Sequence, residues 1–202
     1  MRIKEKKEVN KLIPTLYEPF RHWSATGSVY LISDTHFDDD DCKVMDPNWI
    51  SPAEHIKHIS SIAHRNDTIV HLGDVGNPDY FLNGWKPGKK PHLVLIMGNH
   101  DESAERFAHV FDEIYTGPLF IAEKILLSHE PIYGIDWCLN IHGHDHNKAN
   151  REDKHHINLA SNVVSFKMAN LSDIIKSGAM KQAKGIHRQT IDNARKNQKH
   201  KK

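Results

Sequence analysis

Potential metal ligands gather in five short segments of the chain. The segments are Asp34-Thr35-His36, Gly73-Asp74, Gly98-Asn99-His100-Asp101, Ser128-His129-Glu130-Pro131 and His142-Gly143-His144-Asp145-His146. They combine carboxylates, an amide oxygen and several imidazoles, and this mixed set favours manganese, iron or zinc over magnesium or calcium, because imidazole prefers the softer ions. No cysteine belongs to the set, which argues against a closed structural zinc site.

Seven residues of these segments are candidate ligands: Asp34, His36, Asp74, Asn99, His129, His144 and His146. Seven ligands exceed what one tetrahedral ion needs, but with a shared carboxylate they could hold two ions about 3.5–4 Å apart. A glycine precedes Asp74, Asn99 and His144, and glycine permits tight turns and close backbone approach. The pattern therefore predicts a site for two divalent metal ions.

Each segment follows a short apolar run that is typical of a buried strand. The runs are SVYLIS at 28–33, TIVHL at 68–72, HLVLIM at 92–97, KILL at 124–127 and CLNI at 138–141. Ends of neighbouring strands in an open α/β sheet converge on one edge, where ligand sites usually form. We therefore expect the five segments to meet in space.

The other predicted elements complete a mixed α/β domain. Helices are expected from Pro52 to about His64 and at 77–82, 103–111 and 171–176, with further short strands at 113–116, 118–121 and 156–160. The early alternation of strands and helices predicts one sheet, and the later strand-rich half predicts a second.

Composition changes near both ends of the chain. Residues 1–27 begin with a charged run, contain prolines and predict an N-terminal arm before a domain at 28–180. Residues 181–202 carry a local charge of +7, which leaves the first 180 residues at −6. This basic C-terminal tail suits electrostatic contact with nucleic acid, or a solvated extension with little to bury.

Other sequence features favour a cytoplasmic protein without a membrane partner. The N-terminus is charged, and no apolar run approaches the roughly 20 residues of a membrane span. The two isolated cysteines, Cys42 and Cys138, give no disulfide framework and are expected to be reduced and partly buried. The oligomeric state stays open.

The ordered set DTH, GD, GNHD, H and GHDH resembles the calcineurin-like metallophosphoesterase superfamily, whose usual pattern is D-x-H, G-D, G-N-H-D/E, H and G-H-x-H. The match runs from Asp34 to His146, and the wider similarity covers about residues 28–176. The chain is similar to the small bacterial or phage members that lack a capping domain. The resemblance implies an α/β fold, a four-layer α/β/β/α sandwich with two mixed β-sheets.

The resemblance also implies a role for each residue. One metal would take Asp34, His36, Asp74 and His146, and the other would take Asp74, Asn99, His129 and His144, with Asp74 bridging. His100 resembles the residue that stabilises the transition state or protonates the leaving group, and Asp101 would orient and charge it from behind. A metal-bridging hydroxide would attack phosphorus in line. Manganese is the expected metal, with iron, zinc or nickel as alternatives.

Two departures from relatives bear on the substrate. Protein Ser/Thr phosphatases of this superfamily carry an Asp-Arg-Gly extension after the second motif, whereas here Gly73-Asp74 precedes Val75-Gly76-Asn77-Pro78. Relatives with a DTHF opening often continue with Gly-His, whereas Asp38-Asp39-Asp40-Asp41 follows here. We interpret that run as a solvated acidic loop that disfavours long polyanions. An open cleft, as in relatives without a capping domain, fits a phosphodiester or nucleotide at least as well as a small monoester.

Two other functions remain alternatives. A non-catalytic scaffold on the same fold would bind metal without turnover, although such relatives typically have lost ligands and all seven are present here. A nuclease aided by the basic tail would depend on residues 181–202. Five basic residues could contact substrate phosphate, although each is more often a solvated surface charge: Arg65, Lys86, Lys89, Lys90 and Arg106.

Overall fold

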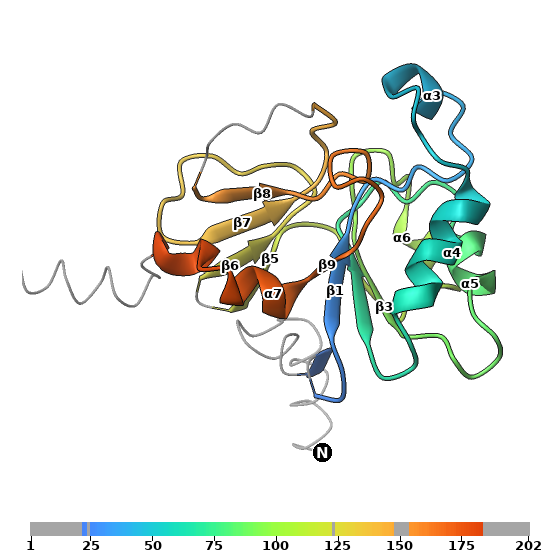
Figure 1. Cartoon of the computed structure of the whole chain (residues 1–202), viewed down its shortest axis with the longest axis horizontal. Coiled ribbons are helices and arrows are strands. Elements are labelled where there is room, and N and C mark those ends of the chain that lie inside the picture. The colour runs from blue at the N-terminus through green and yellow to red at the C-terminus, as the bar shows by residue number, and fades with distance from the viewer. Residues whose placement is uncertain (1–21, 24, 123, 148–153, 184–202) are drawn as a thin grey trace, which may run out of the picture.

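Two mixed β-sheets form the centre of the molecule (Figure 1). The computed structural model describes residues 22–23, 25–122, 124–147 and 154–183. In the first sheet, β1 (Val29–Ile32), β2 (Thr68–His71), β3 (His92–Ile96) and β4 (Glu113–Tyr115) run parallel, and β9 (Ala169–Asn170) joins β1 antiparallel. In the second, β5 (Leu119–Ala122) pairs antiparallel with β6 (Ile125–Leu127), which runs parallel to β7 (Leu139–His142) and β8 (His156–Asn158).

Helices complete the sandwich. Helices α4 (Pro52–Ile62), α5 (Asp79–Asn83) and α6 (Ala104–Phe107) pack on the outer face of the first sheet, while α3 (Cys42–Met45) projects at the top of Figure 1. Helix α7 (Leu171–Lys176) follows β9, contacts β1, and leads to the short 3-10 helix η1 (Ala179–Lys181). The predicted α/β/β/α sandwich with two mixed sheets is confirmed.

Strands β1, β2 and β3 are largely buried on both faces, which explains their mainly apolar runs. Successive residues of a strand point to opposite faces of the sheet. Leu31, Val70 and Val94 accordingly pack in a core between the two sheets, together with side chains from β5, β6 and β7. Ile32, Ile69 and Leu93 pack in a second core beneath the helices. This double burial holds the ends of the parallel strands in fixed positions.

Helix α4 shows how the local sequence sets an element. Ser51 caps it by accepting a hydrogen bond from the Glu54 backbone N–H, and Pro52 occupies the first helical position, where its missing N–H costs nothing. Ile56 and Ile59 lie on one face and are buried against the sheet. The predicted helix is confirmed to within two residues.

Three elements differ from the predictions. The helix expected at 103–111 ends at Phe107, and the chain then makes hydrogen-bonded turns before β4 begins at Glu113. Phe107, Val110 and Phe111 are nevertheless all buried. The helical spacing therefore predicted which side chains are buried, but not that the helix ends early. Helix α3 and strand β9 were not predicted, because elements this short carry no periodicity.

The predicted N-terminal arm includes one residue of the core. Trp23 is 1% exposed between the sheets, and its carbonyl accepts a hydrogen bond from the Thr68 hydroxyl. Residues 1–21 and 184–202 lie outside the described residues, so most of the predicted arm and tail are not placed. Among the described residues, no helix is long and apolar enough to cross a bilayer.

Candidate metal centre

The structure brings the seven predicted ligands together in two groups. Asp34, His36 and His146 have ligand atoms within 4.8 Å of one another, and so do Asp74, His129 and His144. Asn99 joins the second group, because its Oδ1 lies 2.8 Å from His129 Nε2 and 3.0 Å from His144 Nδ1. All seven follow the carboxyl ends of strands or lie in the loops beyond them, as the strand pattern predicted.

Asp74 lies between the two groups. Its Oδ2 is 3.2 Å from His129 Nε2 in one group and 3.7 Å from His36 Nε2 in the other. On the far side of the first group, Asp34 Oδ1 is 3.5 Å from His146 Nε2 and 3.9 Å from His36 Nε2. One carboxylate oxygen therefore faces both groups, which is the arrangement that a bridging ligand requires.

Several donor atoms have the environment of metal ligands. His36 Nε2 is buried without a hydrogen-bond partner among the described residues, although an unpaired buried polar atom is costly. Asp34 is fully buried, and burial raises the pKa of its carboxyl group. Burial is the largest single influence on Asp74 and opposes its ionisation, but the hydrogen bond and charge of His129, the His100 backbone N–H and the charge of His36 together outweigh it and lower the pKa of Asp74 to about 2. Divalent cations would satisfy these atoms, so the donor set fits a metal site.

Backbone strain is concentrated at the same residues. Four candidate ligands have left-handed backbones: Asp34 (φ 55°), His36 (φ 43°), Asp74 (φ 57°) and His144 (φ 66°). Non-glycine residues avoid this region, at a cost of roughly 1–2 kcal/mol each. Hydrogen bonds between loops hold the strained turns, including Asp34 N–H to the Gly73 carbonyl and His36 N–H to the Asp74 carbonyl.

Close backbone approach at the site requires glycine. A Cβ atom on Gly143 would overlap the Ser33 side chain and Asp34 Oδ2, and one on Gly98 would overlap Asp74 Oδ1. The backbone N–H of His144, next to Gly143, donates to both oxygens of Asp34 at 3.1 and 2.9 Å. The predicted role of these glycines in close approach is confirmed.

His100 lies beside the ligand groups without belonging to either. Its ring centroid is 5.6 Å from that of His36, its side chain is exposed, and its backbone N–H donates to Asp74 Oδ1 at 2.9 Å. An exposed imidazole at this position can reach a substrate that binds over the metals. His100 therefore lies beside the candidate ligands, and its role toward a substrate stays a prediction.

Asp101 makes different contacts from those expected. Its carboxylate accepts hydrogen bonds from the backbone N–H groups of Asp74, Val75 and Gly98 at 2.8–3.0 Å. No hydrogen bond joins it to the His100 ring among the described residues. The contacts therefore assign Asp101 to fixing two ligand loops against each other rather than to charging His100.

Partners of the ligand histidines were not apparent from the sequence. Asp39 Oδ2 lies 3.1 Å from His36 Nδ1, Asn162 Oδ1 lies 3.0 Å from His146 Nδ1, and His129 Nδ1 donates to the Leu72 carbonyl at 2.9 Å. Such partners orient metal-bound imidazoles and raise their basicity. The only sequence signal for the contact with His36 is the position of Asp39 three residues later. The acidic run at 38–41 was predicted to be a solvated loop, so this contact was not expected.

His71 supports two of the ligand loops from beneath. Its Nδ1 accepts from the Gly73 N–H at 3.2 Å, and its Nε2 donates to the Thr35 hydroxyl at 3.0 Å, because that hydroxyl itself donates to the Val75 carbonyl. Burial lowers the pKa of His71 to about 3, so the ring is neutral at pH 7. A histidine that looked isolated in the sequence therefore links the first two motifs.

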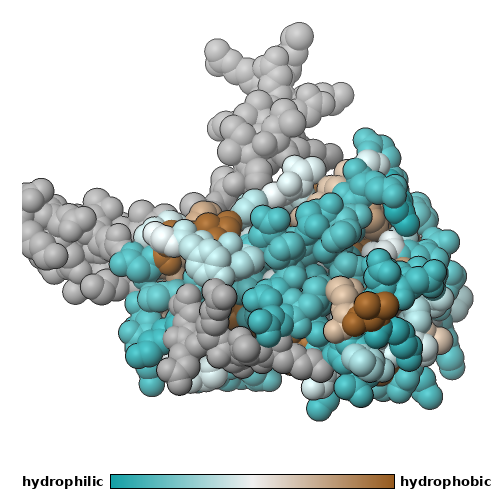
Figure 2. Space-filling view, turned by 90° about the horizontal axis from the view of Figure 1, so that it is seen from above, coloured by the Kyte–Doolittle hydropathy of each residue, from teal (hydrophilic) through white to brown (hydrophobic). Residues whose placement is uncertain are grey.

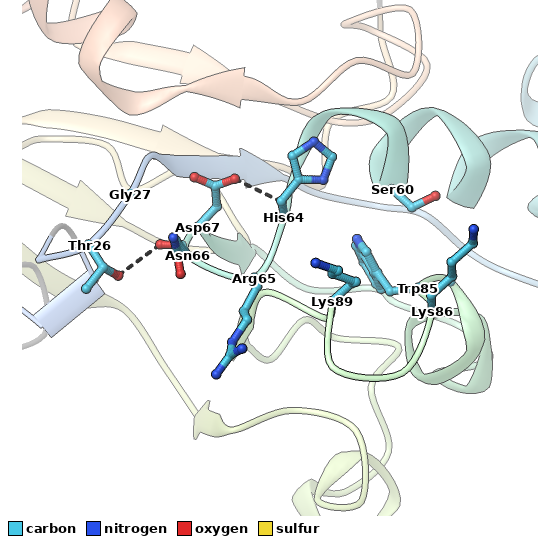
Figure 3. Close-up of a pocket in the computed structure, with 11 residues that line it drawn as sticks. Thr26, Gly27, Ser60, His64, Arg65, Asn66, Asp67, Trp85, Lys86 and Lys89 are labelled. Carbon is cyan, nitrogen blue, oxygen red and sulfur yellow. Dashed lines mark hydrogen bonds between the residues drawn. The ribbon is translucent and has the colours of Figure 1, made fainter.

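Three of the five basic residues that could contact substrate phosphate line a cavity away from the candidate ligands. Arg65, Lys86 and Lys89 line an open cavity of about 1040 Å³ that also contains Gly27 and Asp67, at the amino ends of β1 and β2 (Figure 3). The candidate ligands lie beyond the opposite ends of these strands, so this cavity does not adjoin them. A pocket of about 320 Å³, lined in part by Asn99 and His129, adjoins the ligand groups instead.

A family profile described as calcineurin-like phosphoesterase matches residues 27–173. The chain belongs to this family. No curated protein sequence matches it. Among solved structures, a protein of unknown function from Aquifex aeolicus is similar, with 28% identity and a TM-score of 0.60, over 74% of this chain and 98% of that one.

The fold and the ligand geometry agree with membership of this phosphoesterase family. The matched region includes every predicted ligand and both sheets. The face at the carboxyl ends of the parallel strands is mainly hydrophilic, as the view from above shows (Figure 2). Both cysteines are free and buried. Neither belongs to a candidate ligand group, although the Cys42 thiol donates to the His36 carbonyl at 3.6 Å.

Proposed function

We propose that this protein is a metal-dependent phosphoesterase that acts on phosphodiesters or nucleotides with two divalent ions. The position of Asp74 carries the proposal, because one of its oxygens faces two complete groups of ligand side chains. We assign Asp34, His36, Asp74 and His146 to one ion, and Asp74, Asn99, His129 and His144 to the other. Manganese best suits this mixed set, with iron, zinc or nickel as alternatives.

His100 and Asp101 have different proposed roles beside the two metal ions. Two bound cations would lower the pKa of a water molecule and neutralise charge on the phosphoryl oxygens. His100, exposed beside His36, would donate a proton or hydrogen bond to the substrate as the leaving oxygen separates. Asp101 holds the Gly73–Val75 and Gly98 backbones together, and so positions Asp74 and His100.

The pocket beside Asn99 and His129 supports a substrate with an organic substituent. Its other lining residues include Met97, Pro118 and Ile132, so much of its wall is apolar. A volume of about 320 Å³ can take a group such as a nucleobase with part of its sugar, which a simple phosphate does not need. This favours diesters or nucleotides as the substrate class.

Two variants test the proposal. Asp74→Ala should lose metal and activity together, because both ions depend on this side chain. His100→Ala should keep its metal content and lose about 10²–10⁴-fold in kcat, as expected for a lost general acid. Metal analysis and hydrolysis of an aryl phosphodiester measure the two effects. Full activity of His100→Ala would show that its assigned role is wrong.

A further inference from the structure

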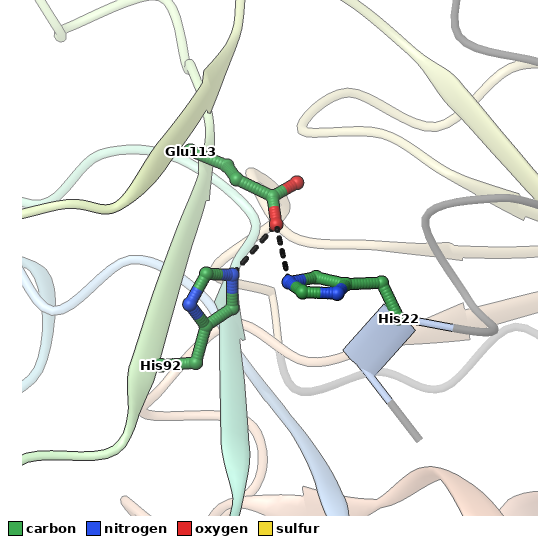
Figure 4. Close-up of side chains that lie close together, drawn as sticks. All are labelled: His22, His92 and Glu113. Atoms are coloured by element: carbon green, nitrogen blue, oxygen red, sulfur yellow. Dashed lines mark hydrogen bonds and ion pairs between the residues drawn. The ribbon is translucent and has the colours of Figure 1, made fainter. Parts of the chain in front are cut away.

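A third group of potential metal ligands lies at the other end of the sheet. His22, His92 and Glu113 each offer one ligand atom, and these atoms lie within 4.8 Å of one another. We propose that this group binds a zinc-class transition-metal ion, separate from the phosphoesterase centre, which fastens the segment at His22 to the parallel sheet. Figure 4 shows the three side chains converging from that segment and two strands.

The position of the group makes it a separate site. His92 is the first residue of β3 and Glu113 is the first residue of β4, whereas Asn99 and His100 follow the carboxyl end of β3. The four residue steps of β3 alone span about 13 Å, at about 3.3 Å per residue. An ion held by His22, His92 and Glu113 therefore cannot be one of the two catalytic ions.

The atoms converge on Glu113 Oε1. His92 Nε2 lies 2.6 Å from this oxygen and His22 Nε2 lies 3.9 Å from it. The longer separation exceeds a hydrogen bond, but suits two ligands that each lie about 2.0–2.2 Å from one ion. A bound ion would replace the proton between His92 and Glu113, and their contact would lengthen.

The chemistry of the ligands selects the ion. Two imidazoles and one carboxylate match the three-ligand zinc sites that keep a fourth position for water. The exposed side chain of His22 leaves room for that water. The two imidazole nitrogen donors favour zinc, cobalt or nickel over calcium or magnesium.

Partners behind the ligands hold them in place. The Tyr115 hydroxyl donates to Glu113 Oε2 at 2.7 Å, and the buried Trp23 indole N–H donates to Oε1 at 3.1 Å. Asp112 Oδ2 lies 3.6 Å from His92 Nδ1, the ring nitrogen that faces away from Glu113. Metal-bound carboxylates and imidazoles commonly have such partners, which fix their orientation.

A histidine–carboxylate pair elsewhere provides a matched control. His109 Nε2 lies 2.9 Å from Asp79 Oδ1, but both side chains are more than half exposed. No third ligand completes that pair among the described residues. Replacing His109 removes an exposed imidazole without touching the proposed site.

Zinc binding to the full-length, tag-free protein tests the proposal. In an Asp74→Ala background, which weakens the phosphoesterase centre, equilibrium dialysis against Zn²⁺ should still find one equivalent that depends on the third group. Adding His22→Ala should abolish that equivalent, and adding His109→Ala should leave it. If His22→Ala and His109→Ala bind the same amount of zinc with the same affinity, the proposal is wrong.

Tyr115→Phe separates metal binding from a purely hydrogen-bonded cluster. Loss of the hydroxyl should weaken zinc binding at this site by about 10–100-fold, as for other partners of metal ligands. If Tyr115→Phe and His22→Ala both had a lower melting temperature but unchanged zinc affinity, the three side chains would stabilise the fold by hydrogen bonds alone, and the proposed metal site would be wrong. Because the readout is zinc binding, either result leaves the proposed phosphoesterase activity untouched.

Discussion

At the residue scale, the candidate ligands were predictable from the sequence, but the residues that contact and orient them were not. The motifs identified the seven candidate ligands and His100, because carboxylates and imidazoles in this order, with one amide, form a distinctive pattern. Asp39 and Asn162 were missed, since their roles depend on how loops fold over the histidines. The left-handed backbones at Asp34 and Asp74 were equally invisible, because they arise from bonds between loops distant in sequence.

Asp39 should strengthen metal binding through His36, although Asp39 is not itself a candidate ligand. Asp39→Ala removes the carboxylate beside His36 Nδ1, and we expect metal affinity to fall by about 10–100-fold. Asp40→Ala, which removes the same charge from the same loop, is the control and should change affinity far less. A titration with Mn²⁺ measures both variants. Equal losses would show that the acidic loop acts only through its charge.

Asp101 should act on the loops and not on the titration of His100. Asp101→Asn leaves backbone N–H groups without their full acceptor, so stability should fall by about 1–3 kcal/mol and Mn²⁺ affinity should fall with it. At saturating Mn²⁺ the pH dependence of kcat should keep its shape. A displaced pH profile with unchanged metal affinity would favour the role inferred from the family resemblance.

At the element scale, strands were predicted better than helices. The apolar runs located β1, β2 and β3, because burial on both faces makes these strands mainly apolar. The helix expected at 103–111 keeps its buried face but ends at Phe107, and hydrogen-bonded turns lead from there to β4. The pairing of the Ser33 and Ala160 regions, which joins the two sheets at the site, had no local signal.

The turn after β7 should tolerate no side chain at its glycine. Gly143→Ala would push its new methyl group into Ser33 and Asp34, so we expect about 1–3 kcal/mol of destabilisation and a large loss of metal-dependent activity. Gly117→Ala is the matched control for stability, because a Cβ there meets open space. Thermal unfolding compares the two variants. Diester hydrolysis compares Gly143→Ala with the parent protein alone, because Gly117 lines the proposed substrate pocket. Normal activity in Gly143→Ala would contradict the close approach described here.

At the scale of the whole molecule, the N-terminal segment contributes more to the core than its composition predicted. The change of composition at Gly27 suggested that the domain begins there, yet Trp23 is buried between the sheets. A single aromatic anchor has no periodic pattern that would reveal its burial. The two-sheet architecture, in contrast, followed from the order of strands and helices and from the family resemblance.

Buried neutral histidines should make the fold sensitive to acid. Burial lowers the pKa of His55 to about 4 and that of His71 to about 3, from about 6.5 in an unfolded chain. The unfolded state therefore binds more protons below about pH 6.5, and stability should fall as pH falls from there toward 4, by up to about 1.4 kcal/mol per pH unit for each group.

Chemical denaturation at pH 7 and pH 5, with a chelator present, measures this loss. His55 packs edge-on against Phe37 and Phe166, and its ring nitrogens have no hydrogen-bond partner among the described residues. His55→Phe should therefore fold and lose less stability between the two pH values than the parent protein. An equal loss in both proteins would rule out His55 as a source of the acid sensitivity.

The most direct test of the phosphoesterase assignment is hydrolysis of an aryl phosphodiester after metal removal and reconstitution. The chelated protein should be inactive, Mn²⁺ should restore turnover, and Asp74→Ala should stay inactive under the same conditions. Absence of hydrolysis with Mn²⁺, Zn²⁺, Co²⁺ and Ni²⁺ alike, or activity of Asp74→Ala equal to that of the parent, would contradict a catalytic centre built around this bridging carboxylate.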